Sequence, residues 1–448
     1  MYLLGVLFVA LGISVSIALH EVGHLLPAKR FGVKITQYMV GFGPTVWSRQ
    51  RGETEYGLKA IPLGGYIRMI GMFPPKPGAD PSILRGSSTG RFSQLMDQAR
   101  EESMEQVKPG DENRVFYKLS TPKKLVVMLG GPTMNLVIAV VLLTGIFTLY
   151  GMAQITSRVS AVSQCVQTTP AAGTAPQTCS PSDPQAPANL AGIRPGDRIV
   201  SLAGHQVSTW DEVRALIRPN GGRQIDVIVQ RNGKQLDLLA TPSLNDVPRY
   251  DAAGRPVVGA DGKALTDRVG FMGFSPSAEI VRQPLSAVPA LIGTQIAGTA
   301  GVVLKIPQKM EGIAKAAFGG GVRDPSLMSV VGVGRVAGEA ADGQLSGLTG
   351  SNSASTKFAF LISLIASLNL ALFIFNLIPL LPLDGGHAAG ALWEGLKRRM
   401  AKLRGLPNPG YVDVAKALPV AYAVSIALIG MSVLLIYADV VNPIKIGG

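Results

Sequence analysis

Long apolar runs alternate with polar stretches along the 448 residues of the chain. Four of these runs hold about 20 residues or more with few or no charges, which is the length that an α-helix needs to cross the roughly 30 Å hydrocarbon core of a bilayer. They cover residues 1–26, 124–150, 358–380 and 417–440. The pattern predicts a polytopic α-helical membrane protein with four transmembrane helices.

The first run is interpreted as a retained span, because no basic segment precedes it and no small-residue cleavage site follows it. Residues 246–357 are weakly patterned, and between 284 and 345 they mix apolar runs with many glycines. We interpret this stretch as an extracytoplasmic juxtamembrane region whose amphipathic helices lie on the outer membrane face. A fifth span around residues 285–304 is the alternative.

Between the first two spans the pattern becomes alternating. Over residues 33–71 apolar and polar side chains alternate and Gly or Pro marks turns, which predicts a β-hairpin sheet within a cytoplasmic or re-entrant region, 27–123. An uncovered edge of this sheet could accept an extended peptide as an added strand. An ordinary cytoplasmic hairpin is the alternative. Residues 92–107 have helical composition with a charged face, which fits a lid or a solvated linker helix.

Residues 151–245 have the pattern of a compact α+β module. A tight turn at 194–197 leads into a strand, a helix follows from Trp210 with a cap near Ser208 or Thr209, and a hairpin turns at 231–234. The run AGIRPGDRIVSLAGHQV followed by a short helix resembles a PDZ domain of the bacterial protease type. His205 falls in a turn of this module, and we interpret it as structural.

Composition agrees with a membrane protein. Only 16% of the residues are charged, although a soluble chain carries about 25%. The net charge of +13 suits nucleic acid in principle, but no basic helix or aromatic-interleaved patch supports that partner. Anionic lipid headgroups of the bilayer account for the positive balance more simply.

Basic residues near the span ends predict the orientation. Lys29 and Arg30 follow the first span, Lys123 and Lys124 precede the second, and a basic loop over 391–416 follows the third. These loops are expected to be cytoplasmic. The N-terminus, the PDZ-like module and the C-terminus are then extracytoplasmic.

The two cysteines of the chain, Cys165 and Cys179, both fall in the region predicted to lie outside the cytoplasm. A pair in such a compartment suggests a disulfide that closes a loop of about 15 residues. Two free thiols are the alternative. A zinc site is disfavoured, because no third ligand lies nearby in the sequence.

The first apolar run ends in the pentad HEVGH. His20 and His24 are four residues apart and share a helix face, so both imidazoles can point at one metal ion. Glu21 lies beside them and can take a proton from a water molecule. Such a pentad also arises by chance. Here, however, residues 2–19 carry no charge, and idle polar groups at this depth of a membrane would be destabilising.

A catalytic zinc site usually has three protein ligands. The other strong ligand cluster in an apolar context is the stretch NLIPLLPLDGGH, in which Asp384 follows the third span and His387 comes three residues later. The predicted topology brings the first and third spans to the same membrane face with their ligands at similar depth. Asp384 and His387 are the two candidates for the third ligand, and the prolines at 379 and 382 would break the helix and turn Asp384 toward the bundle. Asn135, within the GGPTMN stretch of the second span, is either structural glue between helices or part of the site.

These motifs, in this order, resemble the site-2 protease family of intramembrane zinc metalloproteases. The resemblance rests on HEVGH, GGPTMN, an extracytoplasmic PDZ domain and the motif NLIPLLPLDGGH within the third-span region, 358–390, and it covers most of the chain. One departure concerns Leu381, where the family often has a second proline; here Pro382 comes one position later. This departure bears on the local backbone and not on the ligand.

The resemblance implies roles for particular residues. His20, His24 and Asp384 would bind one Zn²⁺ per chain, and Glu21 would act as catalytic acid and base. Asn376 matches an asparagine thought to hold the substrate strand or polarise the scissile carbonyl, and Asn135 is a weaker candidate of the same kind. The hairpin at 33–71 resembles the re-entrant β element that pairs with substrate.

The implied function is regulated intramembrane proteolysis in the bacterial inner membrane. The substrates would be single-span proteins such as anti-sigma factors, already cut once outside the cytoplasm. The competing hypothesis is a membrane-anchored PDZ adaptor with a vestigial metal site, which would need a damaged pentad or a missing Asp384. A zinc peptidase that acts on soluble or prenylated ends is disfavoured by the PDZ domain and the LDGG segment.

Overall fold

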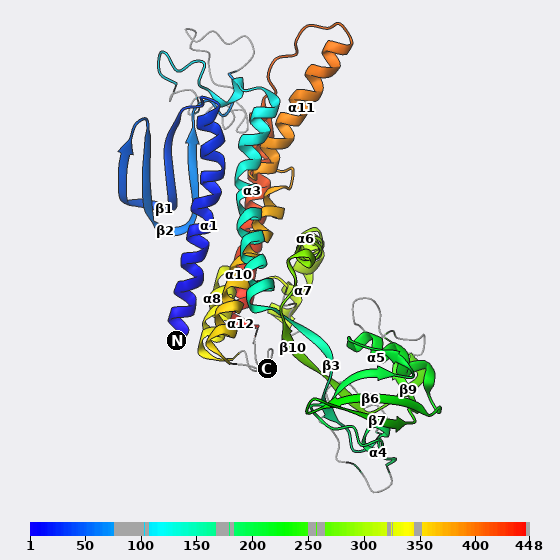
Figure 1. Cartoon of the computed structure of the whole chain (residues 1–448). Coiled ribbons are helices and arrows are strands. Elements are labelled where there is room, and N and C mark those ends of the chain that lie inside the picture. The colour runs from blue at the N-terminus through cyan, green and yellow to red at the C-terminus, as the bar shows by residue number, and fades with distance from the viewer. Residues whose placement is uncertain are drawn as a thin grey trace. The chain divides into compact units, whose positions relative to one another are not determined.

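The computed structural model describes residues 1–75, 103, 107–166, 179, 183–249, 257, 265–319, 324, 326–344 and 352–444. It divides into two compact units, one formed by Met1–Tyr150 with Gln283–Gly448 and the other by Gly151–Arg282 (Figure 1). The helix expected over 92–107 lies outside the described residues except at its Ser103 and Val107 positions.

Long apolar helices build the first unit, which we call the helical unit. They are α1 (Tyr2–Arg30), α3 (Thr121–Gly145), α6 (Val288–Leu304), α10 (Ala354–Asn376) and α12 (Leu418–Val441). Within the described residues, five helical stretches are long and apolar enough to cross a membrane, the additional one being Leu285–Leu304. A polytopic membrane protein is therefore confirmed, whereas the count of four spans is not, because apolar character alone places α6 among the candidates.

The helices α1 and α3 pack with their backbones in contact (Figure 1). A Cβ on Gly23 would lie 2.3 Å from the Gly130 carbonyl oxygen, and a Cβ on Gly130 would lie 2.0 Å from that of Gly23. Such pairs of small residues allow close helix packing in membranes, where apolar burial drives little association. This crossing brings the HEVGH turn of α1 against the start of α3.

Shorter helices complete this unit. They are α7 (Ile306–Gly319), α8 (Val330–Asp342) and α11 (Asp384–Leu403). Short 3-10 helices lie at Phe116–Lys118, Leu285–Ala287 and Val414–Ala417, and a π-helical turn lies at Ile146–Tyr150. The helix α8 packs on α1, where Val9 meets Val336 and Ala337 in a buried cluster. The helix α11 runs along α3, and a buried ion pair joins Lys124 to Glu394 at 2.9 Å.

The alternating stretch forms the expected hairpin, β1 (Ile35–Arg51) and β2 (Thr54–Met69). Gly52 supplies the positive φ of the turn between them. Each strand bends, so the first part of β1, residues 35–40, pairs with residues 55–58 of β2 on one side and with residues 65–69 on the other. Residues 65–69 therefore form an edge of the sheet.

The second unit is an α+β module. Its main sheet has the order β10-β3-β4-β6-β7, with β5 paired to β4, and a separate ladder joins β8 to β9. The elements are β3 (Met152–Val162), α4 (Pro187–Leu190), β4 (Arg198–Leu202), β5 (His205–Gln206), α5 (Trp210–Ile217), a 3-10 turn (Arg218–Asn220), β6 (Ile225–Arg231), β7 (Lys234–Ala240), β8 (Ser243–Pro248), β9 (Thr266–Phe271) and β10 (Phe274–Val281).

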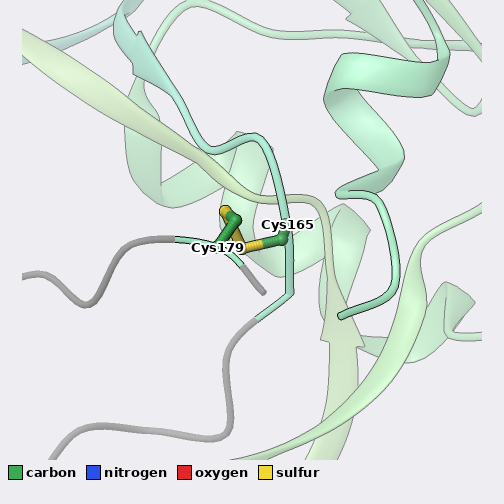
Figure 2. The surroundings of a disulfide bond; sticks show 2 residues. All are labelled: Cys165 and Cys179. Atoms are coloured by element: carbon green, nitrogen blue, oxygen red, sulfur yellow. A yellow bond between two sulfur atoms is a disulfide. The ribbon is translucent and has the colours of Figure 1, made fainter. Parts of the chain in front are cut away.

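Local signals in the sequence of this unit have clear structural counterparts. Thr209 caps α5 in a reciprocal capping box with Glu212, and Asn232 and Gly233 adopt the positive φ values of a tight hairpin turn. The unit continues to Arg282, beyond residue 245 where the sequence pattern places the end of the module, because β10 pairs with β3. Figure 2 shows that Cys165 and Cys179 are joined by a disulfide.

Candidate metal centre

The helix α1 presents His20 and His24 on one face. Their Nε2 atoms lie 3.2 Å apart, and their rings meet edge to face. Neither ring is fully exposed, since the side chains are 14% and 6% accessible. Two imidazole nitrogens held this close repel one another unless a proton or a cation lies between them.

The third group comes from the start of α11. After α10 ends at Asn376, Pro379 and Pro382 prevent the helix from continuing, and the chain turns before α11 begins at Asp384. The Asp384 Oδ2 atom lies 3.3 Å from His20 Nε2 and 3.4 Å from His24 Nε2. Residues far apart in the sequence thus meet at one point, as the predicted topology requires.

The spacing of these three atoms fits a zinc ion. Ligands at 2.0–2.1 Å in a tetrahedral site are separated from one another by about 3.3 Å, and the observed separations are 3.2, 3.3 and 3.4 Å. In addition, Asp384 Oδ2 is buried and has no hydrogen-bond donor. Among the described residues, these three form the group with metal-ligand spacing. Two imidazoles and one carboxylate are a common zinc donor set.

The helix α3 packs along the two histidines. The Nδ1 atom of His24 lies 2.7 Å from the Val127 carbonyl oxygen. A Cβ on Gly131 would lie 2.1 Å from His24 Nε2 and 2.7 Å from His20 Nε2, so only glycine leaves room for both rings. The sequence pattern predicts a role for neither of these α3 residues. The glycine pair in GGPTMN is the one sequence feature that indicates close packing of another helix on α3.

Glu21 opens into the same cleft as the three candidate ligands. The cleft has a volume of about 190 Å³. It is lined by His20, Glu21, His24, Gly65, Tyr66, Ile67, Met69, Met72, Met128, Pro382, Asp384 and His387. Glu21 therefore faces the space where a substrate carbonyl and a water molecule would meet the metal.

The edge of the hairpin sheet borders this cleft. Gly65, Tyr66 and Ile67 belong to the edge segment 65–69, and a Cβ on Gly65 would lie 3.1 Å from Glu21 Cγ. Within the part of the chain that the structure describes, the edge segment pairs with β1 on one side only. An unpaired edge beside a metal site can receive an extended chain as an additional strand.

The remaining sequence candidates lie at different distances from this centre. His387 lines the cleft but falls outside the group with metal-ligand spacing. Asn135 lies behind His20, with its Nδ2 atom 3.0 Å from the His20 Nδ1 atom. Asn376 is the last residue of α10 and is not among the residues that line the cleft.

This arrangement points to a class of protein: a membrane-embedded metallopeptidase whose candidate metal site is assembled from separate helices. The chain belongs to peptidase family M50, the site-2 protease family, whose sequence profile matches residues 8–418. Family membership supports the metalloprotease over the adaptor with a vestigial site.

Particular relatives agree with this assignment. The chain is 33% identical to the zinc metalloprotease Rip1 of Mycobacterium tuberculosis over 456 aligned positions, which cover all of this chain and 99% of the relative. It is also 33% identical to Rip1 of Mycolicibacterium smegmatis, with the same coverage. The zinc metalloprotease RasP of Oceanobacillus iheyensis is 26% identical over 54% of this chain and 63% of the relative.

Proposed function

We propose that this protein is a zinc-dependent endopeptidase that cleaves single-span membrane proteins within the bilayer. The observation that carries the proposal is the tetrahedral spacing of His20, His24 and Asp384 in one cleft with Glu21. Two of the helices that line this cleft, α1 and α3, are long and apolar enough to span a membrane.

Each residue of the centre has a defined role in this proposal. His20, His24 and Asp384 hold one zinc ion, which when bound polarises the scissile carbonyl and lowers the pKa of a water molecule. Glu21 accepts a proton from that water and delivers it to the leaving amine. Both transfers need a carboxylate within reach of the scissile bond, and the position of Glu21 in the cleft suits this requirement.

The substrate is held as an extended strand. A transmembrane helix satisfies its own backbone hydrogen bonds, so it must unwind locally before a peptidase can reach a peptide bond. The edge segment 65–69 offers replacement partners to the unwound backbone beside Glu21. Asn376 stays a candidate for positioning the substrate by family resemblance alone.

Four of the five candidate spans cross the membrane in this proposal. The Tyr150 hydroxyl after α3 donates to Thr356 Oγ1 in the first turns of α10 at 2.9 Å, so these helix ends meet at one end of the helical unit. The chain between them leaves and returns on the same side, which requires an even number of crossings. Among the described residues between them α6 is the sole candidate span, so it lies in or on the membrane without crossing.

The unit formed by Gly151–Arg282 is then extracytoplasmic and acts as the PDZ domain that selects substrates. Its disulfide between Cys165 and Cys179 suits an oxidising compartment. We propose that it excludes intact substrates with bulky outer domains, so that the enzyme acts after a first cut outside the cytoplasm. Anti-sigma factors of the bacterial inner membrane are the substrate class that the family resemblance suggests.

Cleavage of a single-span substrate by the purified protein in liposomes tests the proposal. We expect Glu21→Gln to lower the cleavage rate at least about 100-fold, because the acid–base group is lost. Zinc content should stay at one ion per chain, since Glu21 is not a ligand. Glu311→Gln, an exposed change on α7, is the control and should cleave as the wild type does.

Zinc content also tests the ligand set. Asp384→Ala should lose bound zinc, and His387→Ala should keep it. Wild-type cleavage by Glu21→Gln would contradict the proposed chemistry. Full zinc content in Asp384→Ala with loss in His387→Ala would transfer the third ligand position to His387.

A further inference from the structure

Asn135 is a buried polar residue in the middle of an apolar helix. It is 1% exposed, and its nearest recorded partner is the ring of His20, with Asn135 Nδ2 at 3.0 Å from His20 Nδ1. It is not among the residues that line the cleft. Its side chain therefore contacts His20 on the Nδ1 side, away from the proposed metal, and not the space that a substrate would fill.

The chemistry of the ring decides which atom of the amide faces it. A His20 that binds metal through Nε2 carries its proton on Nδ1, so Nδ1 must donate a hydrogen bond. Only the Asn135 oxygen can accept it. The amide oxygen and nitrogen are equal in shape, and a half-turn of the amide exchanges them. In the orientation shown, the Oδ1 atom lies on the other side, where it is buried and has no hydrogen-bond donor.

His24 is held in the same way from the same helix. Its Nδ1 atom lies 2.7 Å from the Val127 carbonyl oxygen, which can only accept. Val127 and Asn135 are eight residues apart on α3, and they face His24 and His20 in the order expected for antiparallel helices. The helix α3 thus offers one acceptor to each imidazole on the side away from the metal.

We propose that Asn135 is a positioning residue of the metal centre, whose side-chain oxygen accepts a hydrogen bond from the Nδ1–H of His20. This rests on the proposed zinc site. The bond fixes the tautomer that leaves Nε2 free for the metal, and it fixes the ring orientation. Partners of this kind typically contribute about 10- to 100-fold to metal affinity.

Zinc affinity, measured by chelator competition on the purified full-length protein, tests this role without an activity assay. Asn135→Leu keeps the size of the side chain and removes the acceptor, so its affinity for zinc should fall about 10- to 100-fold. Asn135→Asp keeps an oxygen acceptor at the same place and should keep high affinity. The contrast between the two variants separates the hydrogen bond from packing.

Asn369 on α10 offers a matched control. It is also 1% exposed, and it donates to Ser16 Oγ at 2.8 Å and to its own helix, without touching a ligand. Asn369→Leu removes a buried amide from the same bundle and should leave zinc affinity unchanged. An equal loss of affinity in Asn369→Leu and Asn135→Leu would overturn the proposal in favour of general destabilisation.

Two further outcomes separate a failure of the positioning role from a failure of the proposed zinc site. Unchanged zinc affinity in Asn135→Leu together with a raised KM would overturn the positioning role and assign Asn135 to the substrate. Unchanged zinc affinity in His24→Ala would instead show that the metal centre itself is misassigned, which is a failure of the proposed function.

Discussion

At the scale of single residues, the candidate metal centre depends on the absence of a side chain at Gly131 as well as on the ligand residues. Gly131 has no side chain where the two imidazoles meet α3, and a methyl group there would come within 2.1 Å of His24 Nε2. That distance is far inside van der Waals contact. The space that Gly131 leaves open beside the Nε2 atoms, which are the proposed metal-binding atoms, is therefore part of the site.

We expect Gly131→Ala to reduce both bound zinc and cleavage strongly, because the added Cβ must displace His24, His20 or the whole of α3. Zinc stoichiometry of the purified variant measures the effect. Gly145→Ala is the matched control on the same helix, since a Cβ there meets nothing within 4 Å. Full zinc occupancy in Gly131→Ala would contradict the packing described above.

The site was only partly predictable from single residues. The pentad fixes its own geometry through helical spacing, so the sequence pattern alone places His20, Glu21 and His24 together. Val127 could not be found, because it contributes a backbone carbonyl, and any residue type carries one. The orientation of Asn135 toward a ligand depends on the packing of α1 on α3, which no local pattern encodes.

At the scale of elements, α11 carries Asp384 at its first residue and is held to α3 further along. Lys124 and Glu394 are 5% and 2% exposed. Glu394 also forms an ion pair with Arg398 at 3.0 Å and accepts a hydrogen bond from the Val412 N–H at 3.1 Å. A buried carboxylate with several donors and a lysine partner holds the helix at a defined height.

Glu394→Ala should destabilise this contact by about 3–5 kcal/mol, because it leaves the Lys124 ammonium buried without its counter-charge. Hydrogen exchange in residues 384–403 should increase, and zinc should be lost more readily. The double variant Lys124→Met with Glu394→Met should recover much of the protection, since an apolar pair can replace a buried ion pair. Equal exchange in all three proteins would show that the pair does not hold α11.

In the α+β unit, Asp197 joins the turn before β4 to the end of β6. Its carboxylate is 1% exposed and accepts two hydrogen bonds from the Arg231 guanidinium at 2.7 Å and one from the Arg194 N–H at 2.8 Å. Burial raises the pKa of the Asp197 carboxyl, but these hydrogen bonds and the positive charge outweigh burial, so the pKa lies below its usual value.

A carboxyl whose folded pKa is lowered stabilises the fold above its unfolded pKa of about 3.9 and loses that contribution as the pH falls through the folded value. We therefore expect β4 and β6 to lose hydrogen-exchange protection below about pH 4. Asp197→Asn should be less protected at neutral pH and should show a weaker acid dependence. An unchanged acid dependence in Asp197→Asn would assign the effect to other groups.

The sequence pattern predicts some helices and strands better than others. Apolar runs located α1, α3, α10 and α12 well, because a membrane span is defined by length and composition. The helix α6 has a similar apolar composition, and the sequence pattern predicts an amphipathic surface helix there. The contact between the ends of α3 and α10 is the observation that bears on whether α6 crosses. The turns of the α+β unit were predictable from Pro, Gly and Asn, whereas the pairing of β10 with β3 joins strands more than 100 residues apart.

At the scale of the whole molecule, the proposal fixes which parts face which side of the membrane. In the proposal the α+β unit is outside and the basic segment 391–416 is inside. The sequence pattern predicts a loop for this segment, but residues 391–403 form the second half of α11. Single cysteines at Ser208 and at Lys402, in a background with Cys165 and Cys179 replaced by serine, test this arrangement. A membrane-impermeant maleimide should label position 208 in spheroplasts and position 402 only after the membrane is opened.

A position within the 305–319 stretch distinguishes four crossings from five. If α6 does not cross, a cysteine at Lys315, which is 75% exposed, should be labelled together with position 208. Labelling of Lys315→Cys only after the membrane is opened would mean that α6 crosses and that the four-span arrangement is wrong.

The proposed ligands lie far apart in the sequence, so they are synthesised at different times. Asp384 is synthesised 360 residues after His24. At about 5–20 residues per second, roughly 20 to 70 s pass on the ribosome between the two. During that interval the nascent chain holds Glu21 and the two histidines of the proposed site, yet it lacks the carboxylate that completes the proposed donor set. If the site is as proposed, the peptidase cannot become active before Asp384 has been added and has reached the two histidines.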